Sequence, residues 1–289
     1  MKRRIFVKNL GFTALAMSNT NEILKGLHHL SDDEVMLPAM FIGHGSPMNA
    51  IENNEYSRTW MEMGKKLPKP KAILCVSAHW ETSGTKVTAV DKPATIHDFG
   101  GFPQALFDKQ YPAPGAPDFA RMTASQIKKT HVELDFEWGL DHGTWSVLCQ
   151  MFPLANVPVF QLSLDYSKPP QYHYELAQEL AALRKKGVLI IGSGNIVHNL
   201  RLIRFDQPAA FDWAQEFDTR IKQLILSGNH NDIIHYEKMG TFAHLSVPSN
   251  EHFLPLLYVL ALQQKNEQIG FFNEHTTMGS ISMRSVMIG

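Results

Sequence analysis

Histidines are the residues best suited to chemistry in this 289-residue sequence, which contains 14 of them. Four share a setting, because each follows an apolar segment or begins a helical one and stands beside small or turn-forming residues. They are His44 in FIGHGSP, His79 in CVSAHW, His198 in GSGNIVHN and His252 in EHFLPLL. A single histidine of this kind is more often an ordinary hydrogen-bonding residue. Four in matching settings favour a shared function.

Metal binding is the function that best explains several converging imidazoles. Each ring carries two polar nitrogens that need partners, so a cluster of rings without an ion would pack poorly. Neutral imidazole is a good ligand for divalent iron, zinc or copper. A site with three protein ligands also leaves coordination positions free for substrate and oxygen. The sequence therefore predicts that three or four of these histidines bind one metal ion.

A fifth histidine, His142 in LDHGTWSVL, stands between an aspartate and a glycine just before a helical segment. The pKa of histidine lies near neutrality, so His142 is a candidate general acid or base. The alternative is a residue at a helix N-terminus with no chemical role. The nearby GSGN segment lacks the spacing of a phosphate-binding loop, so it gives no reason to expect a nucleotide.

The elements that must position these residues alternate along the chain, which is typical of an α/β fold. The expected strands are Ala39–Ile42, Ala72–Ser77, Thr85–Ala89, Val157–Leu162, Val188–Gly192, Gln268–Phe272 and Ser280–Val286. The expected helices are Ser57–Lys66, Pro117–Lys129, Thr144–Met151, Pro169–Arg184, Ala209–Ser227 and His252–Gln264. His44, His79 and His198 follow expected strands, and ligands bind at the carboxyl edge of open α/β sheets. The prediction is a metal site at that edge.

The segment from Thr95 to Pro117 fits neither kind of element. It combines prolines, glycines and aromatic residues in IHDFGGFP and YPAPGAP. A long irregular loop in a compact domain is usually functional or disordered, and the aromatic content argues against disorder. Phe99, Phe102 and Trp80 could line an aromatic pocket, with core packing as the equal alternative for each.

Composition limits the classes of partner. The formal net charge is -1, from 27 basic and 28 acidic residues, which argues against nucleic acid or an anionic membrane as the main partner. A small-molecule substrate fits better. Cys75 and Cys149 lie in apolar segments, where buried free thiols are expected. The absence of a linker-like segment after Leu37 favours one domain over two.

The first 35 residues differ from the rest and form an expected N-terminal extension, with the catalytic domain spanning residues 36–289. Residues 2–8, KRRIFVK, resemble a twin-arginine export signal, although a clear cleavage site is missing. A functional signal would place the protein in the periplasm, and the alternative is a basic extension on a cytoplasmic protein. No segment approaches the ~20 apolar residues of a membrane-spanning helix.

Several motifs together resemble those of the class III extradiol ring-cleavage dioxygenases, in particular the 4,5-DOPA dioxygenase branch. The motifs are GHGSP, SAHW, HDFGGFP with YPAPG, DHGTW, GSGNIVHN and EHFLPLL, in this order from about Leu37 to the C-terminus. The resemblance implies a single α/β domain with a central mixed sheet flanked by helices and a metal at one sheet edge. It also implies a DOPA-like catechol substrate, molecular oxygen as the second substrate, and a muconic semialdehyde as product.

The resemblance further implies residue roles. His44, His79 and His252 match metal positions, and His198 matches either a fourth ligand or an acid/base group. His142 matches a position near the substrate hydroxyls, so His142 and His198 are the candidates for moving protons. Non-haem Fe(II) is expected for activity, and Zn²⁺ can occupy such a site. Protocatechuate-cleaving relatives use two histidines and a carboxylate, so Glu251 is an alternative third ligand to His252.

Two other classes of protein fit the same histidines. A zinc hydrolase would use the metal to acidify a bound water, and histidine-only ligation suits zinc well. A metal-binding protein without activity would have its open coordination positions filled. Redox-inert zinc cannot pass electrons to oxygen, so catechol turnover with iron and with zinc separates the first class from a dioxygenase.

Overall fold

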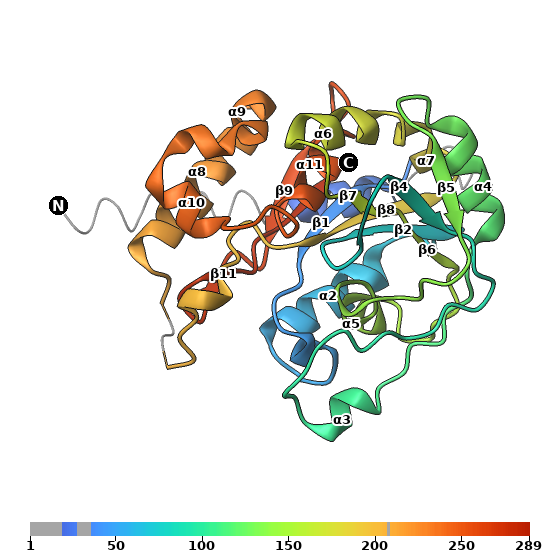
Figure 1. The fold of residues 1–289 in the computed structure, drawn as a ribbon, viewed down its shortest axis with the longest axis horizontal. Coiled ribbons are helices and arrows are strands. Elements are labelled where there is room, and N and C mark those ends of the chain that lie inside the picture. The colour runs from blue at the N-terminus through green and yellow to red at the C-terminus, as the bar shows by residue number, and fades with distance from the viewer. Residues whose placement is uncertain (1–18, 28–35, 207–208) are drawn as a thin grey trace.

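A mixed six-stranded sheet runs through the computed structural model, which describes residues 19–27, 36–206 and 209–289 (Figure 1). The strand order is β6-β2-β8-β1-β12-β9, from β6 (Val159–Gln161), β2 (Ala72–Ser77), β8 (Val188–Gly194), β1 (Ala39–Gly43), β12 (Ser285–Ile288) and β9 (Ile269–Phe272). The first four strands are parallel, whereas β12 and β9 are antiparallel to their neighbours. The predicted single α/β domain with a mixed sheet is confirmed.

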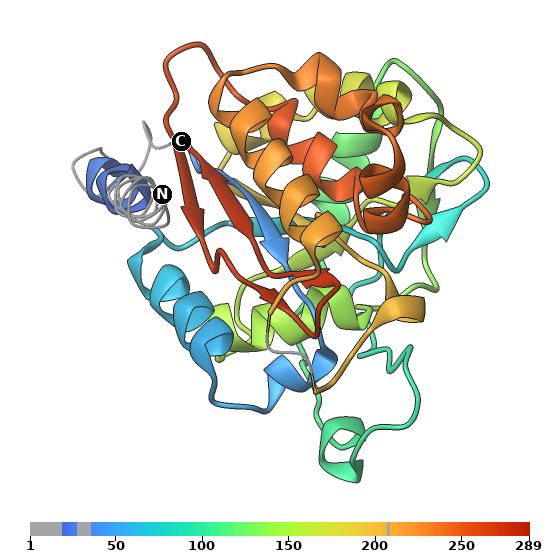
Figure 2. The same ribbon diagram turned by 90° about the vertical axis from the view of Figure 1, so that its left-hand side faces the viewer.

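Both faces of the sheet are covered by helices, because its strands are apolar on both sides. Phe41 of β1 belongs to one core cluster and Met40 to the other, as the two-residue period of a strand requires. The first cluster includes side chains from α4 (Pro117–Gln126), α6 (Pro170–Gln178), α7 (Ala181–Arg184), α8 (Asp212–Leu226) and α11 (Leu254–Leu260). The second includes side chains from α2 (Glu55–Lys66) and α5 (His142–Met151). Figure 2 shows α2 and α5 on one side of the sheet and α8 and α11 on the other.

The remaining elements connect these layers. The helices are η1 (Pro47–Ala50), α2 (Glu55–Lys66), α3 (Gln104–Phe107), α4 (Pro117–Gln126), α5 (His142–Met151), α6 (Pro170–Gln178), α7 (Ala181–Arg184), η2 (Leu200–Leu202), α8 (Asp212–Leu226), α9 (His230–Ile234), η3 (Tyr236–Met239), α10 (Thr241–Ser246) and α11 (Leu254–Leu260). Three two-stranded sheets pair β3 (Glu81–Thr82) with β7 (Leu164–Asp165), β4 (Thr85–Thr88) with β5 (Val132–Asp135), and β10 (Thr276–Thr277) with β11 (Ile281–Ser282).

Two expected elements are divided in the structure. The helix predicted over Pro169–Arg184 is split into α6 and α7, and the strand predicted over Ser280–Val286 is split into β11 and β12. Between β11 and β12, Arg284 turns toward α8 and pairs with the buried carboxylate of Asp218. The chain that carries this buried ion pair therefore does not form one continuous strand from β11 to β12. The alternation of polar and apolar residues in SISMRSV does not reveal this ion pair.

Residues 19–27 form a helix that packs on the edge strand β9. Asn19 donates a hydrogen bond to the Ile269 carbonyl, and Ile23 and Leu24 are buried. The twin-arginine-like residues 2–8 lie outside the described residues, so the export signal stays a prediction. Within the described ranges, no helix has the length and apolarity needed to cross a bilayer. Cys75 and Cys149 are buried free thiols, as expected.

Arg184 is a fully buried cation at the base of the sheet. Its guanidinium pairs with Glu267 and donates to the carbonyls of Leu37 (2.7 Å) and Leu262 (3.0 Å), so it ties together the segments beside β1 and α11. Removing one partner of a buried ion pair leaves an uncompensated charge. We expect Arg184→Leu to lower the free energy of unfolding by about 3 to 5 kcal/mol in urea denaturation.

The matched control is Arg121→Leu, because Arg121 forms an exposed ion pair with Asp118. Exposed pairs contribute little, so this variant should change stability by less than about 1 kcal/mol. Equal effects of the two substitutions would contradict the role assigned to Arg184.

Candidate metal centre

Five histidines from distant parts of the chain line one pocket at the carboxyl edge of the parallel strands. His44 follows β1, His79 lies two residues beyond β2, and His198 follows β8. His142 is the first residue of α5, and His252 lies two residues before α11. The strand-edge position predicted from the sequence is therefore correct. The helix predicted to begin at His252 begins instead at Leu254.

The rings of His44, His79 and His252 are spaced almost equally. Their centres are 5.1, 5.3 and 5.0 Å apart in the three pairs. An imidazole bound through nitrogen at ~2.1 Å has its centre roughly 3.2 Å from the ion, so three ligands at near-tetrahedral angles have ring centres about 5 Å apart. The observed triangle has the size that a single ion requires.

Hydrogen bonds at the Nδ1 atoms fix which nitrogen of each ring is free. The Ser193 hydroxyl donates to the Gly143 carbonyl (2.5 Å), so at 3.0 Å it must accept from Nδ1 of His44. Nδ1 of His252 lies 3.0 Å from a carboxylate oxygen of Glu251, and a carboxylate can only accept. Both rings therefore keep an unprotonated Nε2, the state that binds metal ions.

The free nitrogens fit a shared cation. Nε2 of His44 lies 3.2 Å from Nε2 of His79, and two nitrogens that bind one ion at ~2.1 Å lie roughly 3 to 3.4 Å apart. Nε2 of His252 is buried and has no hydrogen-bond partner among the described residues. A buried nitrogen without a partner is costly, and a metal ion would satisfy it. The donor set therefore fits a divalent transition metal.

His142 and His198 belong to the cluster but are placed differently. The His142 ring centre is 3.9 Å from that of His79, and the His198 ring stacks on His252 at 3.5 Å with 9° between the planes. In-plane lone pairs of stacked rings run parallel, so they do not meet at one ion.

Ligand atoms of His44, His79 and His142 do lie within 4.8 Å of one another, as do those of His198, Glu251 and His252. The spacing of the ring centres, rather than these proximities, separates the triangle of His44, His79 and His252 from the other two histidines.

Burial keeps the imidazoles neutral. It lowers the pKa of His44 and His252 well below the usual 6.5, and the neighbouring histidines lower it further. Burial, followed by the proximity of His142, lowers the pKa of His79 to about 3. Burial lowers the pKa of His198 to about 4, although Glu251 opposes this shift. At neutral pH these rings are unprotonated, as metal binding requires.

The helix that carries His142 is held against β2 by a buried carboxylate. Asp141 caps α5 by accepting from the Thr144 backbone N–H (3.1 Å) and also accepts from the Ser77 hydroxyl (2.6 Å). A Cβ at Gly143 would lie 2.5 Å from the Ser77 hydroxyl oxygen and 2.9 Å from the His79 ring. Only glycine allows this close approach of α5 to the histidine cluster.

Asp98 is the site residue that the sequence analysis missed. One of its carboxylate oxygens lies 3.0 Å from Nδ1 of His142 and 3.4 Å from Nδ1 of His79, and the other accepts the His142 backbone N–H (2.8 Å). Burial alone would raise the pKa of Asp98, but its hydrogen bonds and attraction to His142 lower that pKa below the usual value. The only signal in the sequence was its place in HDFGGFP, the irregular segment expected to be functional.

We expect Asp98→Asn to weaken metal affinity by about 10 to 100-fold, because a partner that orients a ligand ring is lost. Competition with a chromophoric chelator measures this change. The control is Asp108→Asn, since Asp108 is exposed and accepts from Gln104 on α3. An unchanged dissociation constant in Asp98→Asn would show that Asp98 does not orient a ligand.

The pocket in front of the histidines has a volume of about 670 Å³. Phe99 and Phe102 line it, which is one of the two alternatives that the sequence left open, and the Phe99 ring meets the His142 ring edge-on at 5.5 Å. Trp80 instead packs in the interior, where it stacks on Trp138 at 5.7 Å. The irregular segment therefore supplies one wall of the pocket.

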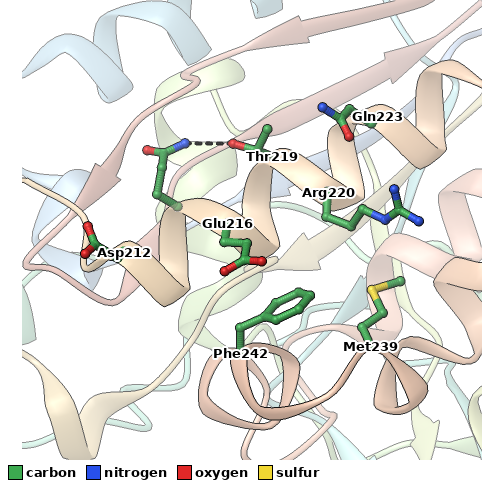
Figure 3. Close-up of a pocket in the computed structure, with 8 residues that line it drawn as sticks. Asp212, Glu216, Thr219, Arg220, Gln223, Met239 and Phe242 are labelled. Atoms are coloured by element: carbon green, nitrogen blue, oxygen red, sulfur yellow. Dashed lines mark hydrogen bonds between the residues drawn. The ribbon is translucent and has the colours of Figure 1, made fainter.

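A second pocket, of about 700 Å³, lies beside α8 and is shown in Figure 3. Asp212, Glu216 and Arg220 of α8 line it together with Met239 and Phe242. Its three charged side chains are exposed, and it contains no cluster of metal ligands among the described residues. The groups that could bind a metal ion therefore lie in the histidine pocket rather than in this second pocket.

Comparisons with known proteins show which proteins this chain is similar to. Residues 38–285 match the family model described as the catalytic LigB subunit of aromatic ring-opening dioxygenase. The protein named 4,5-DOPA dioxygenase extradiol from Escherichia coli (strain K12) is 48% identical over 260 residues, which cover 88% of this chain and 95% of that protein. The protein of the same name from Beta vulgaris is 36% identical, over 88% of this chain and 97% of that one.

A solved structure is also similar. The crystal structure of an uncharacterized protein from Escherichia coli K12 has a TM-score of 0.77 and 42% sequence identity. The match covers 88% of this chain and all of that one. This chain therefore shares its fold with that protein over most of its length.

Proposed function

This chain belongs to the LigB family of aromatic ring-opening dioxygenases, and we propose that it cleaves a catechol ring beside the two hydroxyl groups with molecular oxygen. In this reaction the carbon–carbon bond next to the diol breaks, and both oxygen atoms enter the product, a muconic semialdehyde. The observation that carries the proposal is the triangle of His44, His79 and His252, whose ring centres are 5.0 to 5.3 Å apart.

We assign the metal to these three histidines, with Glu251 as the partner that orients His252. The contact between Glu251 and Nδ1 of His252 (3.0 Å) supports this assignment over Glu251 as the third ligand. The equivalent partners are Ser193 for His44 and Asp98 for His79. A bound Fe(II) would acidify the catechol hydroxyls and let electrons pass from the ring to oxygen.

The remaining two histidines move protons. His142 lines the pocket, and the Asp98 carboxylate beside its Nδ1 orients the ring. His198 also lines the pocket, and burial keeps its ring neutral at neutral pH. One histidine can therefore take a proton from the substrate while the other returns one during ring opening.

The wall formed by Phe99 and Phe102 binds the aromatic ring and excludes water. An apolar wall strengthens electrostatic interactions at the histidine end and protects reactive species from hydrolysis. The polar groups of the catechol are then directed toward the histidines. This orientation places the two hydroxyl groups near the side chains that accept their protons.

The test is oxygen uptake by protein reconstituted with iron or zinc, measured with and without catechol. The proposal expects a yellow ring-opened product and one O₂ consumed per catechol with iron, and neither with zinc. Ester or amide hydrolysis by the zinc form, without oxygen uptake by the iron form, would favour the zinc hydrolase instead.

A further inference from the structure

His198 is the histidine of the cluster whose ring is held least directly. A hydroxyl or carboxylate oxygen lies 3.0 to 3.4 Å from Nδ1 of each of the other four rings. Within the part of the chain that the structure describes, neither ring nitrogen of His198 has a hydrogen bond or ion pair, and its ring contact is the stack on His252, with centres 3.5 Å apart. The orientation of the His198 ring therefore depends on the backbone that carries it.

That backbone is hydrogen-bonded to β11 on one side and to α10 on the other. Ser282 of β11 donates its backbone N–H to the Val197 carbonyl (3.0 Å), and the Asn195 side chain donates to the Ser282 carbonyl (2.8 Å). On the other side, the His198 N–H donates to the Ser246 carbonyl of α10 (2.9 Å). A shift of β11 would therefore move His198.

Two side chains of α8, one helical turn apart, anchor both ends of the β10–β11 hairpin. Asp218 accepts hydrogen bonds from the Ser282 hydroxyl (2.6 Å) and from Nε of Arg284 (3.0 Å), just beyond β11. Lys222 pairs with Glu274 (2.5 Å), which lies just before β10. Arg284 also pairs with Glu274, so the four charges form one network. The hairpin is thereby fixed to one face of α8.

We propose that the buried Asp218–Arg284 pair positions His198, by holding β11 where the His198 ring stacks on His252. The inference rests on the proposed function, in which His198 moves a proton, and names the residues that hold this ring in place. Asp218 is 3% exposed and Arg284 is 5% exposed. A buried ion pair is often no more stabilising than an apolar pair of similar volume, so stability alone does not account for it.

Proton transfer is sensitive to small displacements of the group that carries the proton. A general acid or base must lie within hydrogen-bonding reach of its substrate, and a displacement of about 1 Å caused by a distant substitution can lower a rate by about 100-fold. The same hairpin also supplies Met278 and Ile281 to the pocket lining. A test must therefore separate an effect on His198 from an effect on this wall.

A double-mutant cycle between Asp218→Asn and His198→Phe in the iron-loaded enzyme makes this separation. Asparagine keeps the shape of the side chain at position 218 and removes the charge that pairs with Arg284. Asp218→Asn should lower kcat by about 10 to 100-fold in the parent enzyme. In the His198→Phe background it should lower kcat by less than about twofold, because the ring that it positions no longer carries a proton. An equal loss in both backgrounds would contradict the proposal.

The matched control is Glu267→Gln, which removes the charge that pairs with the buried Arg184 at the opposite end of β1. It should lower stability in urea to a similar extent as Asp218→Asn and change kcat by less than about twofold. A loss of kcat in Glu267→Gln as large as that in Asp218→Asn would mean that lower stability alone explains the effect.

Ser282→Ala is a second variant that does not alter the ion pair. It removes the hydroxyl that donates to Asp218 and leaves the contact between Asp218 and Arg284 in place. We expect a loss of kcat of about threefold or more, which is again absent in the His198→Phe background. Full kcat in both Ser282→Ala and Asp218→Asn would overturn the proposal.

Nuclear magnetic resonance of the zinc-loaded protein gives a readout that does not depend on turnover. The ring signals of His198 are identified by their absence from His198→Phe. They should shift in Asp218→Asn and Ser282→Ala, because the ring moves relative to its stacked neighbour, and should stay in place in Glu267→Gln. Unmoved ring signals in both Asp218→Asn and Ser282→Ala would show that the pair does not position His198.

The two readouts also separate this inference from the proposed reaction. If the iron form consumes no oxygen with any catechol, the proposed function fails, and the ring signals still decide whether the Asp218–Arg284 pair positions His198. If the ring signals move but His198→Phe keeps full kcat, the positioning is supported and the proton-transfer role of His198 is wrong.

Discussion

His44→Ala is expected to abolish metal retention and, with it, catechol turnover. His44 is 1% exposed, and its Nε2 faces that of His79 at 3.2 Å, so alanine removes a donor from the centre of the cluster. Loss of an orienting partner weakens metal affinity by about 10 to 100-fold, and loss of a ligand should exceed that range. Metal analysis after dialysis measures retention, and oxygen uptake measures turnover.

The stability of the protein gives a second readout for His44→Ala. A metal that binds the folded state stabilises it, so iron or zinc should raise the melting temperature of the parent protein. His44→Ala should lose this increase. The control is His173→Ala, because His173 is also fully buried but hydrogen-bonds to Tyr258 away from the cluster. This control should unfold at lower temperature and still bind metal.

Metal retained at full stoichiometry by His44→Ala would remove His44 from the ligand set. Loss of metal from both variants would instead indicate that damage to folding is the cause. The control can separate loss of a ligand from damage to folding, because His173 lies on α6, away from the cluster, whereas His44 lies at the end of β1.

The strand-edge histidines could be predicted because they depend on local patterns. Apolar runs before His44, His79 and His198 identify three parallel strands, and the carboxyl ends of such strands lie at one edge of a sheet. The bounds of β2 agree with the prediction at both ends. Continuous apolar runs were sufficient here, because these strands are buried on both faces.

The position of His252 depends on tertiary contacts that periodicity does not show. The sequence predicted a helix that starts at this residue, but residues 251–253 form a turn before α11. The His252 carbonyl accepts a hydrogen bond from the Asn195 backbone N–H (2.9 Å), just beyond β8. A Cβ at Gly194 would lie 2.1 Å from that carbonyl oxygen, so glycine is required for the turn to approach the strand.

The partners of the histidines were the least predictable part of the site. Asp98 precedes His142 by 44 residues, and Ser193 follows His44 by 149 residues. Side-chain hydrogen bonds over such separations leave no periodic pattern in a sequence. They nevertheless decide which nitrogen of each ring is free, so the chemistry of the site depends on contacts visible only in three dimensions.

His142→Phe is expected to retain the metal and to slow turnover by about 10²-fold or more. Phenylalanine preserves an aromatic ring between His79 and Phe99, whose centres lie 3.9 and 5.5 Å from that of His142. It cannot exchange a proton or contact the Asp98 carboxylate through a ring nitrogen. The binding of catechol should change little, so the loss should fall on kcat rather than on KM.

The comparison with His198→Phe identifies the direction of proton transfer. If the two histidines act at different steps, each variant should alter a different limb of the pH–rate profile, and the double variant should be no faster than the slower single variant. Metal content is measured in parallel for every variant. Loss of metal from His142→Phe in proportion to its activity would make His142 a ligand, and the triangle of His44, His79 and His252 would then be the wrong assignment.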